Sequence, residues 1–152
     1  MRRLVAAFII ATITLAGVAR PGRAQGTQPT ADTAAALQAA QTAGEAWLTL
    51  IVEGKGKESW AATSKHFQAA VTEAAWAQQA AELRTQLGTF RSRKLADAQY
   101  AIDPPDAPAG EYVMLLYESV FANLPAAREL VTLTREDGQW KVIGYFVRPA
   151  GM

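Results

Sequence analysis

Two glutamates in the second half of the chain are the residues best suited to chemistry. Glu129 and Glu118 both lie in stretches where apolar residues alternate with others, and a carboxylate held in an apolar pocket can act as a general base. The alternation places Glu129 on the face that would meet the core. A basic residue at the edge between helices and sheet, namely Arg84, Arg91 or Arg93, would instead make Glu129 half of an ion pair. We favour the ion pair and keep the base as the alternative.

Other site chemistries find little support in the composition. The chain has no cysteine and a single histidine, His66, whereas a zinc site takes about three or four protein ligands. A Ser-His-Asp triad would have to use His66, and no Gly-x-Ser-x-Gly elbow is present. Glycine-rich phosphate loops are also missing. We therefore predict no metal, no cofactor and no catalytic residue.

The first 24 residues have the layout of a bacterial secretory signal. Arg2 and Arg3 precede an uncharged, mostly apolar run over residues 4–18. The small residues Gly22 and Ala24 then occupy the two positions that signal peptidase recognises, with cleavage expected after Ala24. The apolar run is shorter than the roughly 20 residues of a membrane-spanning helix. We expect residues 1–24 to be a signal peptide, residues 25–32 a flexible leader, and the protein to be periplasmic or secreted with no stable membrane anchor.

Removal of that segment changes the charge balance. The whole chain has 15 basic and 14 acidic residues, and four of the arginines lie within residues 1–24. The remaining chain therefore carries a net charge of about −3. Nucleic-acid-binding domains usually have a basic excess on one face, so we predict no nucleic-acid partner.

Helical periodicity fills the first half of the predicted domain, residues 33–149. One apolar stripe runs over residues 33–53, with Asp32 as its expected N-cap and Gly54 as its stop. Residues 60–71 form one helix or two short ones. Thr72 starts a further helix that ends at Gly88.

From Phe90 onward the apolar period changes to two. Candidate strands cover 90–101, 111–122, 127–136 and 139–148, and Asp137-Gly138 is a typical two-residue hairpin turn. Helices followed by strands predict an α+β fold, in which N-terminal helices pack on a four-stranded, curved antiparallel sheet.

The register of the last hairpin assigns residues to two faces. With Glu136 opposite Gln139, strict alternation pairs Glu129 with Phe146 on the core face. It places four partly apolar residues on the outer face, namely Leu130, Ile143, Tyr145 and Val147. That apolar content predicts a contact surface for a second copy of the chain or for an envelope protein.

Two further features bear on binding. Strand 111–122, which contains Tyr117, is apolar on both faces, and such strands usually have something packed on each side. Helices, a partner subunit or a ligand could fill that role. Arg91, Arg93 and Lys94 form a basic cluster that could bind an anion, although we favour a role in guarding the sheet edge.

The chain resembles a known family through a set of short motifs in order. They are Ala46-Trp47-Leu48, Ser59-Trp60, Trp76, Arg84 with Leu87-Gly88, Ser92-Arg93-Lys94-Leu95, Gly110-Glu111-Tyr112-Val113, Phe121-Ala122-Asn123 and the run from Gly138 to Tyr145. This pattern is similar to the secreted bacterial family called domain of unknown function 4019, over about residues 40–148. The resemblance implies export and a cystatin-like or NTF2-like fold, in which a curved sheet wraps helices. It implies no activity and no catalytic residue.

Together these observations predict an exported, non-catalytic binding or accessory protein. Its candidate ligand or partner contacts are Glu129, Tyr117, Arg93, Leu130, Ile143 and Tyr145. The alternative is a small-molecule lyase or isomerase that uses Glu129 as its base.

Overall fold

The structure, a computed structural model, describes residues 31–151. The predicted signal peptide (1–24) and leader residues 25–30 lie outside the described residues. Helix α1 (Ala31–Val52) takes up the last two residues of the predicted leader. Asp32 therefore lies in the first turn of α1, where a carboxylate favours the helix dipole, and is not the N-cap.

Three shorter helices follow α1 in the order expected from the apolar pattern. They are α2 (Gly56–Ala61), α3 (Lys65–Ala70) and α4 (Glu73–Leu87), so residues 60–71 contribute to two short helices. Side-chain oxygens cap two of them, because Ser64 Oγ accepts a hydrogen bond from Phe67 N and Thr72 Oγ1 accepts one from Ala75 N.

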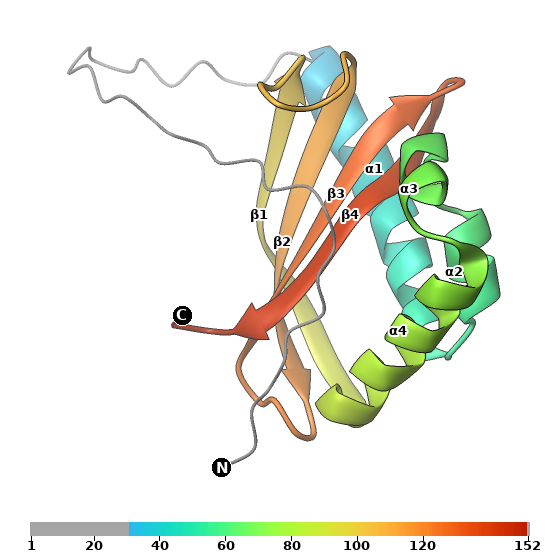
Figure 1. Cartoon of the computed structure of the whole chain (residues 1–152). Coiled ribbons are helices and arrows are strands. Elements are labelled where there is room, and N and C mark those ends of the chain that lie inside the picture. Colours follow the sequence, from blue (N-terminus) through green and yellow to red (C-terminus); the bar gives the residue numbers. More distant parts are fainter. Residues whose placement is uncertain (1–30, 152) are drawn as a thin grey trace.

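The second half of the chain is one antiparallel sheet in the order β1-β2-β3-β4. Its strands are β1 (Phe90–Ile102), β2 (Glu111–Phe121), β3 (Ala127–Glu136) and β4 (Gln139–Pro149). All helices lie on one side of this open, twisted sheet (Figure 1). The predicted α+β fold with a four-stranded antiparallel sheet is confirmed, and each strand end lies within one residue of its prediction.

The core lies between α1 and the sheet face that the helices cover. Trp47 and Trp76 are buried there, while Trp60 and Trp140 are partly buried and pack against the same cluster. Large aromatic side chains bury much apolar area, which a domain without disulfides needs. No helix of residues 31–151 is long and apolar enough to cross a membrane.

A β-bulge in β4 corrects the predicted hairpin register. Leu133 pairs with Val142 as expected, but Thr132 then pairs with Gly144, so Ile143 is an extra residue in β4. Every β4 residue beyond Ile143 consequently changes faces relative to strict alternation. Glu129 pairs with Val147 and not with Phe146.

The predicted outer face loses two members through this bulge. Tyr145 is buried in the main core and Val147 packs against it. The outer face instead presents Phe146, which is 36% exposed, beside the half-buried Leu130. The bulge lies next to a contact between β4 and the helices. Val142, the residue before Ile143, accepts a hydrogen bond from Ser64 N through its carbonyl and forms a β-bridge with Thr63.

Candidate functional site: a cavity beside a buried carboxylate

One polar side chain from each strand meets on the helix-facing side of the sheet. Arg93 of β1 pairs with Ser119 of β2, Glu129 of β3 lies one pleat further along, and Tyr145 of β4 lies diagonally across from Glu129. The bulge in β4 puts Tyr145 on this face. The four residues, which we call the Glu129 cluster, therefore depend on the register of the whole sheet.

Glu129 is fully buried and has three hydrogen-bond donors. Its Oε1 accepts a hydrogen bond of 2.6 Å from the Tyr145 hydroxyl. Its Oε2 accepts one of 2.7 Å from Arg93 Nε and another from the Ser119 hydroxyl. A buried carboxylate needs a paired cation and hydrogen bonds to offset the loss of water, and this cluster supplies both.

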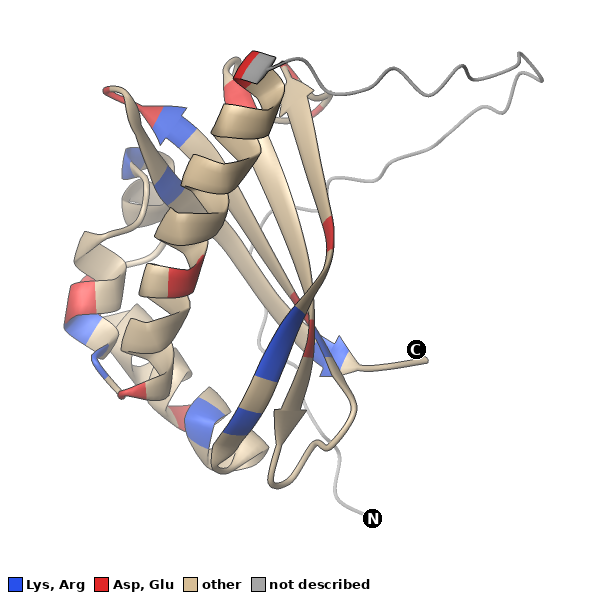
Figure 2. Cartoon of the chain, turned by 180° about the vertical axis from the view of Figure 1, so that it is seen from behind, with Lys and Arg blue, Asp and Glu red and all other residues tan. Residues whose placement is uncertain are grey.

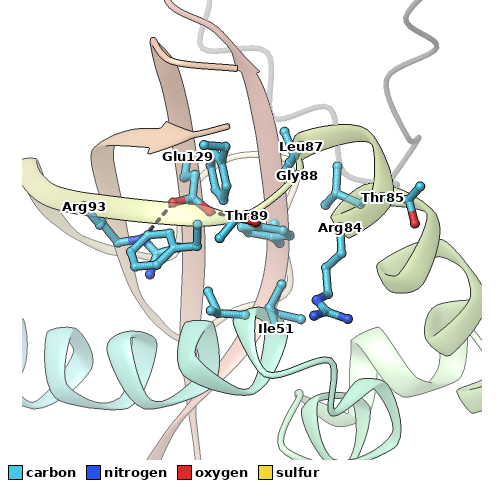
Figure 3. Close-up of a pocket in the computed structure, with 13 residues that line it drawn as sticks. Ile51, Arg84, Thr85, Leu87, Gly88, Thr89, Arg93 and Glu129 are labelled. Carbon is cyan, nitrogen blue, oxygen red and sulfur yellow. Dashed lines mark hydrogen bonds and ion pairs between the residues drawn. The ribbon is translucent and has the colours of Figure 1, made fainter. Parts of the chain in front are cut away.

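A cavity of about 370 Å³ opens beside the Glu129 cluster. Figure 3 shows Arg93 and Glu129 on one side of it, Arg84 and Thr85 on the other, and Ile51 of α1 below. Most of the wall is apolar and comes from the ends of α1 and α4 and from the adjoining strands. The apolar lining residues are Ile51, Val52, Leu83, Leu87, Phe90 and Phe121.

The turn between α4 and β1 forms part of the cavity wall. Gly88 ends α4 with φ of +73°, a conformation that glycine adopts without strain. The β2–β3 loop then fastens this turn, because Asn123 N donates to Leu87 O and Ala122 N donates to Thr89 O. A Cβ on Gly88 would also come within 2.9 Å of the Asn123 side chain. The end of α4 is therefore fixed in position beside the cavity.

A comparison with models of known protein families shows to which family the chain belongs. The model of a family described as "Protein of unknown function (DUF4019)" matches residues 43–145, which spans α1 to β4 and includes the whole Glu129 cluster. The chain belongs to the DUF4019 family. No curated protein matches this chain.

The DUF4019 chain divides its basic cluster between two environments. The Arg93 side chain is only 13% exposed and points into the core, whereas Arg91 and Lys94 are exposed. Figure 2 shows that basic residues gather in the first half of β1, which is an edge strand. Arg91 and Lys94 fit the predicted edge-guarding role, and Arg93 is the one of the three candidate arginines that pairs with Glu129.

Two buried tyrosines of this DUF4019 chain have hydroxyls with altered acidity. Burial, and then the charge of Glu129 and the hydrogen bond to it, raise the pKa of Tyr145 well above 10. Burial also raises the pKa of Tyr117 to about 12. The Tyr117 hydroxyl has no hydrogen-bond partner among the described residues. Both hydroxyls are therefore neutral near pH 7.

The structure brings together only some of the predicted contacts. Glu129, Arg93 and Tyr145 line the cavity, and Tyr117 lies behind it in the core with its ring 5.7 Å from the Arg93 guanidinium carbon. Leu130 and Ile143 are not in the cavity wall. Glu118, the second candidate base, is outside the Glu129 cluster and forms an ion pair with Arg128 at 3.2 Å.

Sequence reasoning missed Ser119 and considered Arg84 only as one of three possible ion-pair partners of Glu129, a role that Arg93 fills. Ser119 had a signal, because it is the one polar residue among the alternate positions Val113, Leu115, Tyr117 and Phe121 of β2. No signal placed Arg84 in a cavity wall, since a basic residue in a last helical turn is explained by the helix dipole. His66 is exposed, and residues 31–151 hold no group of three or more metal-ligating side chains.

Proposed function

We propose that this DUF4019 protein is a non-catalytic binding protein that holds a small molecule in the cavity beside Glu129. The observation that carries the proposal is a space of about 370 Å³ next to a fully buried, ion-paired carboxylate. Ligand pockets commonly have volumes of about 300–1,000 Å³, with mostly apolar walls and a few convergent polar groups. The cavity has this composition.

Binding is better supported than catalysis by the state of Glu129. Three donors already occupy the two carboxylate oxygens. A base must lie within hydrogen-bond reach of the proton that it removes, and the fully buried Glu129 has about one acceptor site left for a substrate. The lyase or isomerase alternative therefore has less support than the binding role.

A titration followed by two-dimensional amide NMR tests the proposal. We expect small amphiphilic molecules such as cinnamyl alcohol and cinnamate to shift the amide signals of Gly88, Thr89 and Phe90 at millimolar concentration. Val52→Trp should fill the cavity and abolish these shifts. Val120→Trp makes the same change at an exposed position of β2, outside the cavity wall, and should leave them intact. Absence of saturable shifts in the unmodified protein would refute the proposal.

We also propose that the protein acts after export, in the periplasm or outside the cell. The support is the basic, apolar and small-residue layout of residues 1–24. Fractionation of the native cells followed by mass spectrometry of the N-terminus tests it. We expect a chain in the periplasm or medium that starts near Gln25, and an uncut chain in the cytoplasm would contradict the proposal.

Contact with a second copy or an envelope protein through the outer sheet face remains a prediction. The bulge at Ile143 moves Tyr145 and Val147 to the other face and so removes two of the four residues on which it was based. Size-exclusion chromatography with light scattering tests self-association.

A further inference from the structure

The Arg93 guanidinium has unused hydrogen-bonding capacity at the cavity. Glu129 binds Arg93 at Nε, and the guanidinium carbon lies over the Phe90 ring at 4.7 Å. Within residues 31–151, neither of the two terminal nitrogens has a hydrogen-bond partner. Because a guanidinium carries five N–H donors in a planar fork, this one can hold an additional anion while it remains paired with Glu129.

The charges around the cavity do not cancel. Its ionisable lining groups near neutral pH are Arg84, Arg93 and Glu129, which together carry one net positive charge. Arg84 is exposed, has no carboxylate partner among the described residues, and stretches over Gly54, where an added Cβ would be 2.5 Å from its terminal nitrogen. The wall opposite Glu129 therefore presents a second cation.

The other lining residues of the cavity favour a ligand with an apolar organic part. Leu83, Leu87, Phe90 and Phe121 contribute apolar surface between the two arginines, and burial of apolar ligand surface is favourable by about 25 cal/mol per Å². An inorganic anion would leave this surface without a partner. A dianion would exceed the single positive charge and would lie close to the buried Glu129 carboxylate.

We propose that the ligand is a small monoanionic organic acid, whose carboxylate is bound by the terminal nitrogens of Arg93 while its apolar part fills the cavity and Arg84 on the opposite wall adds to the positive potential. The inference rests on the proposed binding function and specifies its ligand class. Arginine–carboxylate pairs are among the stronger hydrogen-bonded contacts in proteins. The Glu129 cluster then acts as a positioning set, because Glu129 fixes the orientation of the guanidinium and leaves its other edge to the ligand.

Isothermal titration with three molecules of the same carbon skeleton tests the charge preference. We expect cinnamate to bind about tenfold more tightly than cinnamyl alcohol, and cinnamylamine to bind most weakly. The preference for cinnamate should fall as salt is raised, because Arg84 is exposed to solvent. Equal or tighter binding of the alcohol or the amine would overturn the anion assignment and leave the binding function intact. If none of the three binds, both proposals fail.

Variants at the two arginines locate the anion. Arg84→Glu should weaken cinnamate binding about tenfold and strengthen cinnamylamine binding. Arg91→Gln removes a cation from the same strand as Arg93 but outside the cavity wall, and should change neither by more than about twofold. An Arg84→Glu protein that binds cinnamate like the unmodified protein would overturn the role of Arg84.

The role of Arg93 needs a variant that does not leave a buried charge alone. Arg93→Gln with Glu129→Gln removes both charges together, and we expect cinnamate affinity to fall about tenfold while alcohol affinity stays within about threefold. Unchanged cinnamate affinity would refute the anchoring role. If this double variant does not fold, Arg84→Glu still decides the charge preference. Tighter binding of phenyl phosphate than of cinnamate would overturn the assignment to a monoanion.

Discussion

Two of the buried polar groups in the described part of the chain, Ser59 in the helix layer and Glu129 in the sheet, find their hydrogen-bond partners in different ways. In the helix layer, Ser59 is fully buried between Trp47 and Trp76; its carbonyl accepts from Trp47 Nε1 at 2.8 Å and its hydroxyl accepts from Trp76 Nε1 at 2.9 Å. We call these three residues the Ser59 cluster. In the sheet, the Glu129 cluster holds a full charge with donors from the other three strands.

The difference lies in what surrounds each cluster. Aromatic rings pack closely around the Ser59 cluster, with Phe67 5.2 Å from the Trp76 ring, and none of its three members lines the 370 Å³ cavity. The two charged residues of the Glu129 cluster, Arg93 and Glu129, line that cavity. Neutral groups are satisfied by one partner each, so they suit a closed core. Burial of an ion pair costs desolvation free energy that largely offsets the attraction of the two charges. Because such a pair adds little stability, its position beside a cavity favours a role in binding.

The largest expected effect comes from breaking the ion pair of the Glu129 cluster. Arg93→Met would leave the Glu129 carboxylate buried without a cation, and we expect the free energy of unfolding to fall by about 3–5 kcal/mol. Urea denaturation followed by tryptophan fluorescence measures this loss.

The matched control removes both charges together. Arg93→Met with Glu129→Gln leaves no lone buried charge, so most of the lost stability should return. A single variant that loses less than about 1 kcal/mol would mean that Glu129 is not held as a charge, and the contrast with the Ser59 cluster would disappear.

Alkaline pH should weaken the sheet side of the core next. The pKa of Tyr117 is about 12 in the folded chain, against about 10 unfolded. A raised folded pKa means that the unfolded state loses its proton first, so the contribution is complete below pH 10 and is lost as pH rises toward 12. We expect a loss of about 2 kcal/mol by pH 12 from Tyr117.

Tyr145 should add to this loss in the same direction, because burial and Glu129 raise its pKa as well. Urea midpoints at pH 8, 10 and 11.5 measure the dependence. Tyr117→Phe should reduce the slope, and a slope equal to that of the unmodified protein would show that Tyr117 does not carry it.

A smaller effect is expected in the Ser59 cluster. Ser59→Ala removes the hydroxyl that accepts from Trp76 Nε1 and donates to Gly56 O at 2.8 Å. The cost should be about 1–2 kcal/mol, because one buried N–H loses its acceptor while the Trp47 bond to the Ser59 carbonyl remains. Urea denaturation checks it, and a loss as large as that of Arg93→Met would contradict the distinction between neutral and charged clusters.

The sequence predicts the elements of this fold better than the site between them. Strand ends follow from local signals such as Asp137-Gly138, whose positive φ angles of +50° and +76° form the expected tight turn. The pairing of Glu129 with Arg93 was one of three weighed from charge alone, because no local signal selects among arginines that lie far along the chain.

The bulge and the cavity show where local reasoning fails. Strict alternation put Tyr145 outside, although a glycine within a strand, here Gly144, often marks a bulge. In β4 the apolar phase also changes, from Trp140 and Val142 to Tyr145 and Val147. The cavity gave no local signal because its lining residues come from α1, α4 and all four strands, which lie far apart in the sequence.

The smallest expected effect concerns a polar group outside both clusters. The Tyr117 hydroxyl is buried and has no hydrogen-bond partner among the described residues. Tyr117→Phe should therefore raise the free energy of unfolding at pH 7 by about 1 kcal/mol, because it removes an unsatisfied group and keeps the ring in place.

Tyr145→Phe is the matched control. It removes a hydroxyl that donates 2.6 Å to Glu129, so the same change should destabilise by about 2 kcal/mol. Thermal or urea denaturation of the two variants side by side measures both signs. Equal destabilisation would place Tyr117 in the polar network of the Glu129 cluster, which would then extend beyond the four strand residues that now define it.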